Sequence, residues 1–351
     1  MQIYYGLPGT PFSNPVYLTI GNFDGVHLGH QRLICELARA AHRTGGLAGL
    51  LTFEPHPVAV LRADLVVPRL TSNDEREDLL AALGLDFVIV HPFTRETANT
   101  TAAAFLATLA GVLPLAELWV GPDFALGQAR EGNIERLSEL GREMDFSVQV
   151  IPTLDWAGET VRSSRVRSLL SEDGAVEQAA ALLGRPYRLT AEVVRGAQRG
   201  RLLGFPTANL LVPDDRLTPA YGVYACWAWR GERGYPAVVN VGVRPSFDNG
   251  HPSVEAHLIG FTGDLYGEML GLSFIARLRG EKKFRRLRAS SRRSPRIPRA
   301  RGASCRLPTR TRSRWRSKRG ASCRTRLTMR SRCTEPMHAC FSPMPRWRCM
   351  A

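Results

Sequence analysis

The sequence predicts an α/β domain with a parallel, Rossmann-like sheet, then a small antiparallel β-barrel domain, then a basic tail without regular structure. Short apolar runs alternate with amphipathic helical patterns from residue 16 to about residue 170, which is typical of a parallel sheet covered by helices. Beyond residue 184 the apolar runs have strand length and turn residues separate them, as in a small barrel or sandwich. We therefore divide the chain into residues 1–184, 185–284 and 285–351.

The elements of the first domain follow from the period of its apolar residues. The run at residues 16–20 is long enough for a buried strand, and Leu33, Ile34, Leu37 and Ala41 repeat with helical spacing. In such sheets ligands bind beyond the carboxyl ends of the strands, so polar residues directly after strands become candidates for a site. By the same criteria we expect strands at 16–20, 47–53, 87–90, 118–120 and 147–151, and helices at 31–43, 73–83, 100–110 and 133–142.

The second domain begins after a helix stop. A helical pattern at residues 174–183 ends at Gly184, and Pro186 follows two positions later. Beyond this point no helical pattern lies between the apolar runs. We expect strands at 187–194, 222–229, 237–241, 253–259 and 272–278.

The stretch GNFDGVHLGH occupies residues 21–30, between the first expected strand and the helix after it. Such a corner gathers free backbone N–H groups and the positive end of a helix dipole, which suits a polyanion such as a nucleotide triphosphate. His27 and His30 are three positions apart, so both imidazoles can face the same phosphate. The spacing also fits an incidental pair or two ligands of a metal site, although no third ligand with matching spacing follows.

The whole stretch resembles the signature of the nucleotidylyltransferase superfamily, in the form carried by bacterial FAD synthetases. The resemblance implies that FMN attacks the α-phosphorus of ATP and that pyrophosphate leaves, without a covalent enzyme intermediate. It implies that His27 and His30 are catalytic residues that hold the triphosphate and stabilise charge. The nucleotide-binding positions that it implies in this stretch are Gly21, Asn22, Phe23, Asp24 and Gly29.

Three later loops resemble the same family. Residues 53–57 read as a Pro-rich turn by themselves, and the resemblance places them near the flavin and the phosphates. Residues 120–127 resemble its loop for nucleotide and flavin, with Ala125 and Leu126 where an arginine and a phenylalanine are usual. Residues 162–167 resemble its closing Ser-Ser-Thr-x-Ile-Arg motif with Arg162 in place of the first serine, and we expect Ser163 to cap a helix there. The implied contacts are Phe53, Pro55, His56, Asp123, Phe124 and Asn133 for the flavin, and Ser163, Ser164 and Arg167 for the nucleotide.

In the second domain, residues 200–209 read GRLLGFPTAN, which resembles the signature of riboflavin kinases. By the resemblance, Thr207 and Asn209 hold Mg²⁺ carrying ATP, in keeping with the preference of Mg²⁺ for oxygen ligands. Glu255 is implied as the general base that takes the proton of the riboflavin 5′-hydroxyl. Without the resemblance, these residues would be turn caps and a solvated strand residue. The implied nucleotide-binding positions are Gly200, Arg201, Gly204, Pro206 and Thr207.

The excess of positive charge that gives the whole chain a net charge of +15 lies in the tail. Residues 285–351 contain 21 lysines and arginines and one acidic residue, so the rest of the chain is mildly acidic. The same stretch contains five of the seven cysteines, and the other two do not suggest a disulfide framework. We prefer the hypothesis that the tail arises from a frameshift in a GC-rich gene; a genuine basic arm that binds nucleic acid or anionic lipid is the alternative.

Together these patterns predict a transferase that converts riboflavin to FMN and FMN to FAD, with Mg²⁺ as cofactor and ATP as co-substrate. We expect a cytoplasmic protein without a membrane segment, because neither a signal peptide nor a run of about 20 apolar residues is present. We expect no nucleic-acid partner unless the tail is genuine. Two alternatives remain: an adenylyltransferase whose kinase half is impaired by the altered C-terminus, and a basic-tailed nucleic-acid-binding protein on an inactive fold.

Overall fold

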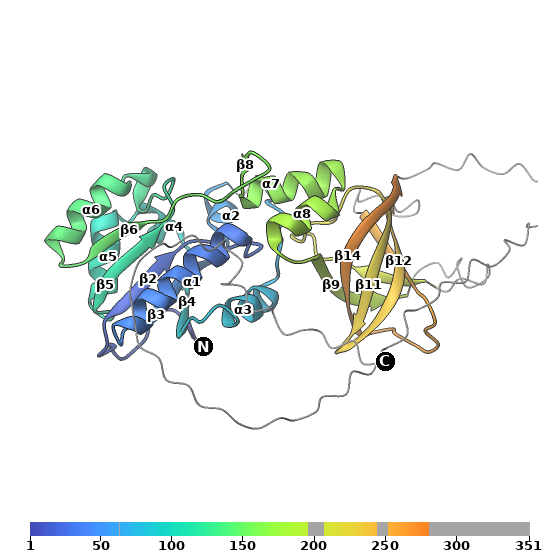
Figure 1. Ribbon diagram of the computed structural model, residues 1–351, viewed down its shortest axis with the longest axis horizontal. Helices are drawn as coiled ribbons and strands as arrows, with labels where there is room; N and C mark the ends of the chain where they lie inside the picture. Colours follow the sequence, from blue (N-terminus) through green and yellow to red (C-terminus); the bar gives the residue numbers. More distant parts are fainter. Residues whose placement is uncertain (63, 196–206, 244–251, 281–351) are drawn as a thin grey trace, which may run out of the picture. The chain divides into compact units, whose positions relative to one another are not determined.

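The computed structural model describes residues 1–62, 64–195, 207–243 and 252–280 (Figure 1). All of these residues belong to one compact unit, residues 1–283. Within them a six-stranded sheet comes first and a closed six-stranded barrel follows, which confirms the predicted fold class. None of the helices in these ranges is long and apolar enough to cross a membrane.

The sheet is parallel throughout, with strand order β1-β4-β3-β2-β5-β6. Every residue of β2 is buried, as expected for a central strand with helices on both faces. The strands are β1 (Gln2–Tyr5), β2 (Val16–Ile20), β3 (Leu47–Glu54), β4 (Phe87–Pro92), β5 (Leu115–Val120) and β6 (Ser147–Val150).

Side chains that alternate along these strands enter two separate cores. Val16, Leu18 and Ile20 of β2 pack in one cluster together with residues of α5 and α6. Tyr17 lies in the other cluster, with residues of α1 and with Leu80 of α3. The helices involved are α1 (Leu28–Arg43), α3 (Asn73–Ala81), α5 (Ala102–Ala110) and α6 (Ile134–Glu143). The predicted three-layer arrangement is therefore present, because successive side chains of a strand point to opposite faces.

Several elements differ from the prediction in their bounds. The first helix begins at Leu28, because the side chain of His27 caps it. A break at Thr100 divides the helix expected at 100–110 from a preceding short helix, α4 (Arg95–Asn99). Strand β1 was not predicted, since it is short and lies at the sheet edge with half-exposed side chains. Other unpredicted elements are α2 (Pro57–Leu61) and the hairpin of β7 (Asp155–Trp156) and β8 (Glu159–Thr160).

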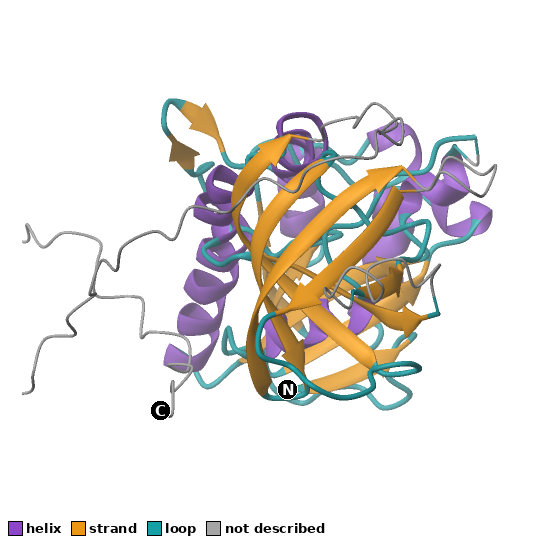
Figure 2. Ribbon diagram, turned by 90° about the vertical axis from the view of Figure 1, so that its right-hand side faces the viewer, coloured by secondary structure: helices purple, strands orange, loops and turns teal. Residues whose placement is uncertain are grey.

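The barrel closes with strand order β10-β13-β12-β11-β14-β9, and every pairing is antiparallel (Figure 2). Strand β10 was missed because it is only four residues long and overlaps the end of the kinase-like motif. The strands are β9 (Tyr187–Val194), β10 (Ala208–Leu211), β11 (Gly222–Arg230), β12 (Arg233–Val243), β13 (Pro252–Leu258) and β14 (Met269–Gly280).

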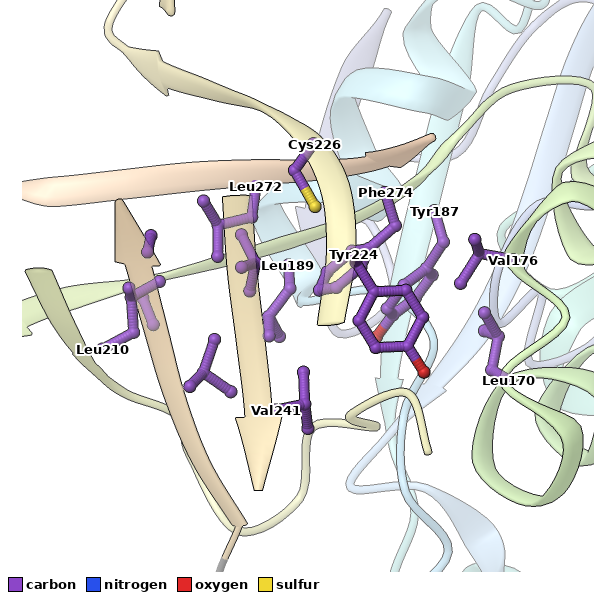
Figure 3. Packing of buried hydrophobic residues seen from close by; sticks show 14 of the residues in the cluster. Leu170, Val176, Tyr187, Leu189, Leu210, Tyr224, Cys226, Val241, Leu272 and Phe274 are labelled. Carbon is purple, nitrogen blue, oxygen red and sulfur yellow. The ribbon is translucent and has the colours of Figure 1, made fainter. Parts of the chain in front are cut away.

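The barrel core extends beyond its own strands. Tyr187, Tyr224 and Phe274 are fully buried aromatic residues, and Leu170 and Val176 pack in the same cluster (Figure 3). The latter two come from the short helices that precede the barrel: α7 (Ser163–Ser168), the single π turn η2 (Leu169–Asp173) and α8 (Val176–Leu183). Helix α8 ends at Gly184 in the left-handed conformation, as the predicted helix stop requires.

Candidate active sites

A cavity of about 390 Å³ opens where the strand order of the sheet reverses. Strand β2 lies between β3 and β5, so the chain leaves it toward one edge of the sheet and later returns to its other side. Parallel sheets bind ligands at such switch points, beyond the carboxyl ends of the two strands. The cavity is lined by residues at or after the ends of β2, β5 and β6 and by the start of α7, including Gly21, Asn22, Phe23, His27, Gly29, His30, Val120, Asp123, Phe124, Thr153, Arg162 and Ser163.

The loop between β2 and α1 has an unusual backbone. Phe23 and Val26 both have positive φ values, 49° and 40°, although neither is a glycine and Val26 is β-branched. Such residues persist only where the surrounding structure enforces them, and they concentrate at functional sites. Here Arg185 contributes, because its guanidinium donates to the carbonyl oxygens of Gly25 and Val26. The loop is therefore held from outside the motif.

The two histidines of this loop lie side by side at the cavity. His27 caps α1, and its Nδ1 accepts a hydrogen bond from the backbone N–H of His30 at 3.3 Å. The two rings stack with centroids 3.6 Å apart and planes 17° apart. The Nδ1 of His30 is buried and has no hydrogen-bond partner among the described residues. The expected convergence of both imidazoles on one place is thus present.

Burial keeps both imidazoles neutral. Loss of water lowers the pKa of His27 to about 4, and the charge of Asp24 only partly opposes this effect. Burial, reinforced by the neighbouring His27, lowers the pKa of His30 well below its usual value. A neutral imidazole donates through one ring nitrogen only. Since Nδ1 of His27 accepts a hydrogen bond, its proton lies on Nε2.

Asp24 does not line this cavity. Its buried carboxylate accepts hydrogen bonds from the backbone N–H groups of Leu70 and Thr71 and from the Thr71 hydroxyl. It also pairs with Arg167, whose Nη2 lies 2.6 Å from Asp24 Oδ2 and whose Nε donates to the carbonyl oxygen of Pro68. Two residues expected at the nucleotide therefore contact each other.

The expected helix cap at Ser163 is wrong. Helix α7 begins at Ser163, so Arg162 is the residue before it, and Arg162 makes no capping hydrogen bond with its side chain. The hydroxyl of Ser163 instead donates to the backbone carbonyl of Asp24 at 2.8 Å, which ties this end of α7 to the motif loop. Ser163 lines the cavity, whereas Ser164 is exposed and does not.

The residues expected to bind the flavin do not all lie in one place. Asp123 and Phe124 line both the main cavity and a neighbouring hollow of about 430 Å³, which Asn133 also lines. Asn133 caps α6 by accepting from the N–H of Arg136. By contrast, Phe53 is buried in the sheet core and Pro55 is exposed.

His56 lies next to the motif loop, because its Nε2 is 3.2 Å from the side-chain amide nitrogen (Nδ2) of Asn22. Its other ring nitrogen accepts from the N–H of Val58 and caps α2. Burial lowers the pKa of His56, and the charge of Arg167 adds to the effect. The turn at residues 53–57 and the loop at 21–30 therefore meet.

Two groups of cavity residues were not singled out from the sequence. Arg162 was set aside because it departs from the family motif, yet it lines the cavity and pairs with Asp123. The segment Ile151–Leu154 also lines the cavity. The sequence could have identified this segment as a candidate for the site, because it follows a predicted strand of a parallel sheet.

The barrel has a cavity of its own, of about 530 Å³, which Thr207 lines. Asn209 and Glu255 lie directly opposite each other on β10 and β13, and Asn240 of β12 lies opposite Glu255 on its other side. Val254 and Ala256 point into the core, so Glu255 between them points outward. Gly200, Arg201, Gly204 and Pro206 lie outside the described residues.

Two family models cover most of the unit described above. Residues 10–165 match the FAD synthetase family and residues 183–290 match the riboflavin kinase family. A bifunctional riboflavin kinase/FMN adenylyltransferase from Escherichia coli K12 is 36% identical over 270 residues, which are 76% of this chain and 85% of that protein. The chain belongs to this bifunctional family.

A second curated relative and a solved structure are also similar to the chain. The riboflavin kinase/FMN adenylyltransferase of Pseudomonas fluorescens is 34% identical over 292 residues, which are 82% of this chain and 93% of that protein. A solved structure titled a macrolide-efflux protein from Streptococcus pneumoniae has a TM-score of 0.72 and 29% identity, and covers 80% of this chain and 92% of that chain. The riboflavin kinase/FMN adenylyltransferase family thus accounts for both the sheet and the barrel, which confirms the resemblance found in the sequence.

Proposed function

We propose that this family member phosphorylates riboflavin to FMN in its barrel domain and transfers AMP from ATP to FMN in its sheet domain. The observation that carries the proposal is the cavity at the β2–β5 switch point, which both histidines of the GNFDGVHLGH loop line. Dinucleotides and nucleotides bind at this place in open α/β sheets, so ATP has a site there on general grounds. The two domains match the two halves of the reaction sequence.

In adenylyl transfer, a phosphate oxygen of FMN attacks the α-phosphorus of ATP, and the bond from that phosphorus to the bridging oxygen breaks to release pyrophosphate. His27 and His30 act as neutral hydrogen-bond donors to the phosphates. The Nε2 proton of His27 is available for this role, because its Nδ1 is occupied by the N–H of His30. Donors fixed in this way stabilise the charge that develops on the leaving oxygen without reorganisation during the reaction.

The remaining expected residues take supporting roles in this proposal. Gly21, Asn22, Phe23, Gly29 and Ser163 contact the nucleotide, since they line the cavity. Asp24 and Arg167 act as a pair that holds the loop, and Ser164 contributes from the exposed start of α7. The flavin lies along Asp123, Phe124 and Asn133 toward the neighbouring hollow, with Pro55 and His56 at its phosphate end and Phe53 packed beneath.

In the barrel, Glu255 takes the proton of the riboflavin 5′-hydroxyl while that oxygen attacks the γ-phosphorus of ATP and ADP leaves. Asn209 lies opposite this carboxylate on β10, and Thr207, just before that strand, lines the barrel cavity. The side-chain oxygens of Thr207 and Asn209 would hold Mg²⁺, which would neutralise phosphate charge when bound. Gly200, Arg201, Gly204 and Pro206 complete the proposed nucleotide loop.

Two variants of the full chain test the assignment of the two reactions. We expect His30→Ala to abolish FAD formation from FMN and to leave FMN formation from riboflavin intact, and Glu255→Ala to do the reverse. Both reactions are followed with MgATP and chromatographic separation of the flavins. A single change that ended both activities equally would contradict separate sites. If the wild-type protein converts FMN but not riboflavin, the alternative of an impaired kinase half is correct.

A further inference from the structure

The cavity at the switch point contains one fixed positive charge. Among the residues that line it, Arg162 is the sole lysine or arginine and Asp123 is the sole acidic residue. The two histidines add no charge near pH 7, because burial lowers the pKa of both. A triphosphate that enters this cavity therefore meets one guanidinium, and that guanidinium already has a carboxylate partner.

The partner of Arg162 is easily exchanged. Its Nη2 lies 2.6 Å from Asp123 Oδ2, and the two side chains are 56% and 68% exposed. Ion pairs as exposed as this one are weak, since water screens the charges and both side chains lose freedom. Phosphate oxygens offer a guanidinium a stronger, bidentate partner. Arg162 can therefore leave Asp123 for a phosphate at little cost.

The other two arginines of residues 162–167 form ion pairs outside the cavity. Arg167 pairs with the buried Asp24, as described above. Arg165 pairs with Glu159 at 2.6 Å and donates to the carbonyl oxygen of Trp156, both in the β7–β8 hairpin. Neither lines the cavity. Of the three arginines in α7 and just before it, Arg162 alone faces the proposed nucleotide.

The sequence offers an independent reason for a cation at position 162. Ala125 stands where the resembling loop usually has an arginine, and Arg162 stands where the closing motif usually has a serine. Both positions adjoin Asp123 in the structure, since Ala125 is two residues from it and Arg162 pairs with it. Ala125 lines the neighbouring hollow and not the cavity, whereas Arg162 places a positive charge in the cavity beside Asp123.

We propose that Arg162 binds the triphosphate of ATP during adenylyl transfer and exchanges Asp123 for phosphate oxygens when ATP enters. This inference rests on the proposed binding of ATP in the switch-point cavity. It makes Arg162 a nucleotide-binding residue particular to this chain, at a position where the family motif has a serine. It also makes Asp123 a competitor for the guanidinium in the empty site.

The test compares the KM for ATP in the two reactions of the full chain. We expect Arg162→Ser to raise the KM for ATP in FAD formation about ten-fold, as for a lost charged hydrogen bond, with kcat changed less than about three-fold. The KM for ATP in FMN formation stays unchanged and reports an intact barrel. Added salt raises the wild-type KM more steeply than that of the variant, because one ionic contact is missing.

A matched control and a second variant make the result specific. Arg165→Ser makes the same chemical change three positions away and should leave the KM for ATP in FAD formation within about two-fold of wild type. Asp123→Asn, measured with saturating FMN, should lower that KM, since it removes the competitor of the phosphate. An unchanged KM in Arg162→Ser, or a raised KM in Asp123→Asn, overturns the proposed exchange. FAD formation that survives His30→Ala would instead overturn the proposed site itself.

Discussion

Asp24 and Arg167 are 143 positions apart in the sequence, and their side chains meet at 2.6 Å in a partly buried ion pair. Asp24 belongs to the loop after β2 and Arg167 to α7, so the pair joins the start of the sheet domain to the helix that leads toward the barrel. The same carboxylate accepts hydrogen bonds from the backbone of Leu70 and Thr71. One side chain therefore connects the motif loop, residues 70–71 and helix α7.

We expect Asp24→Asn to lower the free energy of unfolding by about 3 kcal/mol, because it leaves the charge of Arg167 without its buried partner. FAD formation should fall at least about ten-fold, since the loop that carries both histidines loses its anchor. Urea denaturation and the FMN-to-FAD assay measure the two effects. Adding Arg167→Gln should then cost little more, and fully additive losses would contradict the coupling.

We expect Gly29→Ala to lower FAD formation without lowering the stability of the protein. A Cβ at this position would lie 3.2 Å from the His27 ring, so the imidazole must shift by a few tenths of an ångström. Alanine favours the helix over glycine by roughly 1 kcal/mol, so the protein should be no less stable. We expect FAD formation to fall about ten-fold through the displaced imidazole. Gly9→Ala is the control, because no atom lies within 4 Å of its Cβ; equal activities of the two variants would contradict the role of His27.

The pKa of His27 predicts how stability depends on pH. Burial lowers this pKa to about 4, so below its ordinary value of 6.5 the unfolded chain takes up a proton that the folded protein excludes. Stability should thus fall as the pH drops from about 6.5 to about 4, by about 2 kcal/mol between pH 7 and pH 5 from this residue. Urea midpoints at the two pH values measure the change. His27→Gln should show a smaller decrease, and an equal decrease would assign the effect to other groups.

Removal of residues 285–351 should leave FAD formation from FMN unchanged. All residues that line the switch-point cavity lie between Thr19 and Ser163, far from the tail in sequence. The truncated and full chains are compared in the FMN assay and in DNA binding at low and high salt. DNA binding that depends steeply on salt and disappears with the tail would support a genuine basic arm over the frameshift hypothesis. Loss of FAD formation would contradict the independence of the two regions.

The sequence by itself determined the family and the order of the longer elements, while the short strands β1, β7, β8 and β10 and the short helix α2 were not predicted. Period and length separate the helices from the strands, since side chains repeat every 3.6 residues in a helix and every two in a strand. The GNFDGVHLGH and GRLLGFPTAN stretches carry the family resemblance, because the residues of each motif are contiguous in the sequence. The spacing of His27 and His30 also predicted that both imidazoles can face the same side, although the helix begins at Leu28 and not at residue 31 as expected.

Only the tertiary structure decided which distant residues share a site. Strand order places the end of β5 beside the end of β2, and no local pattern encodes that order. It therefore brings Asp123 to Arg162 and places both in the cavity that His30 also lines. Burial is likewise a property of the packed chain: it turns Asp24 from an expected nucleotide contact into the partner of Arg167, and it keeps His27 and His30 neutral. Packing and desolvation depend on all neighbouring groups together. A sequence motif can therefore identify these residues as candidates for a site, but it does not predict which side chains they contact.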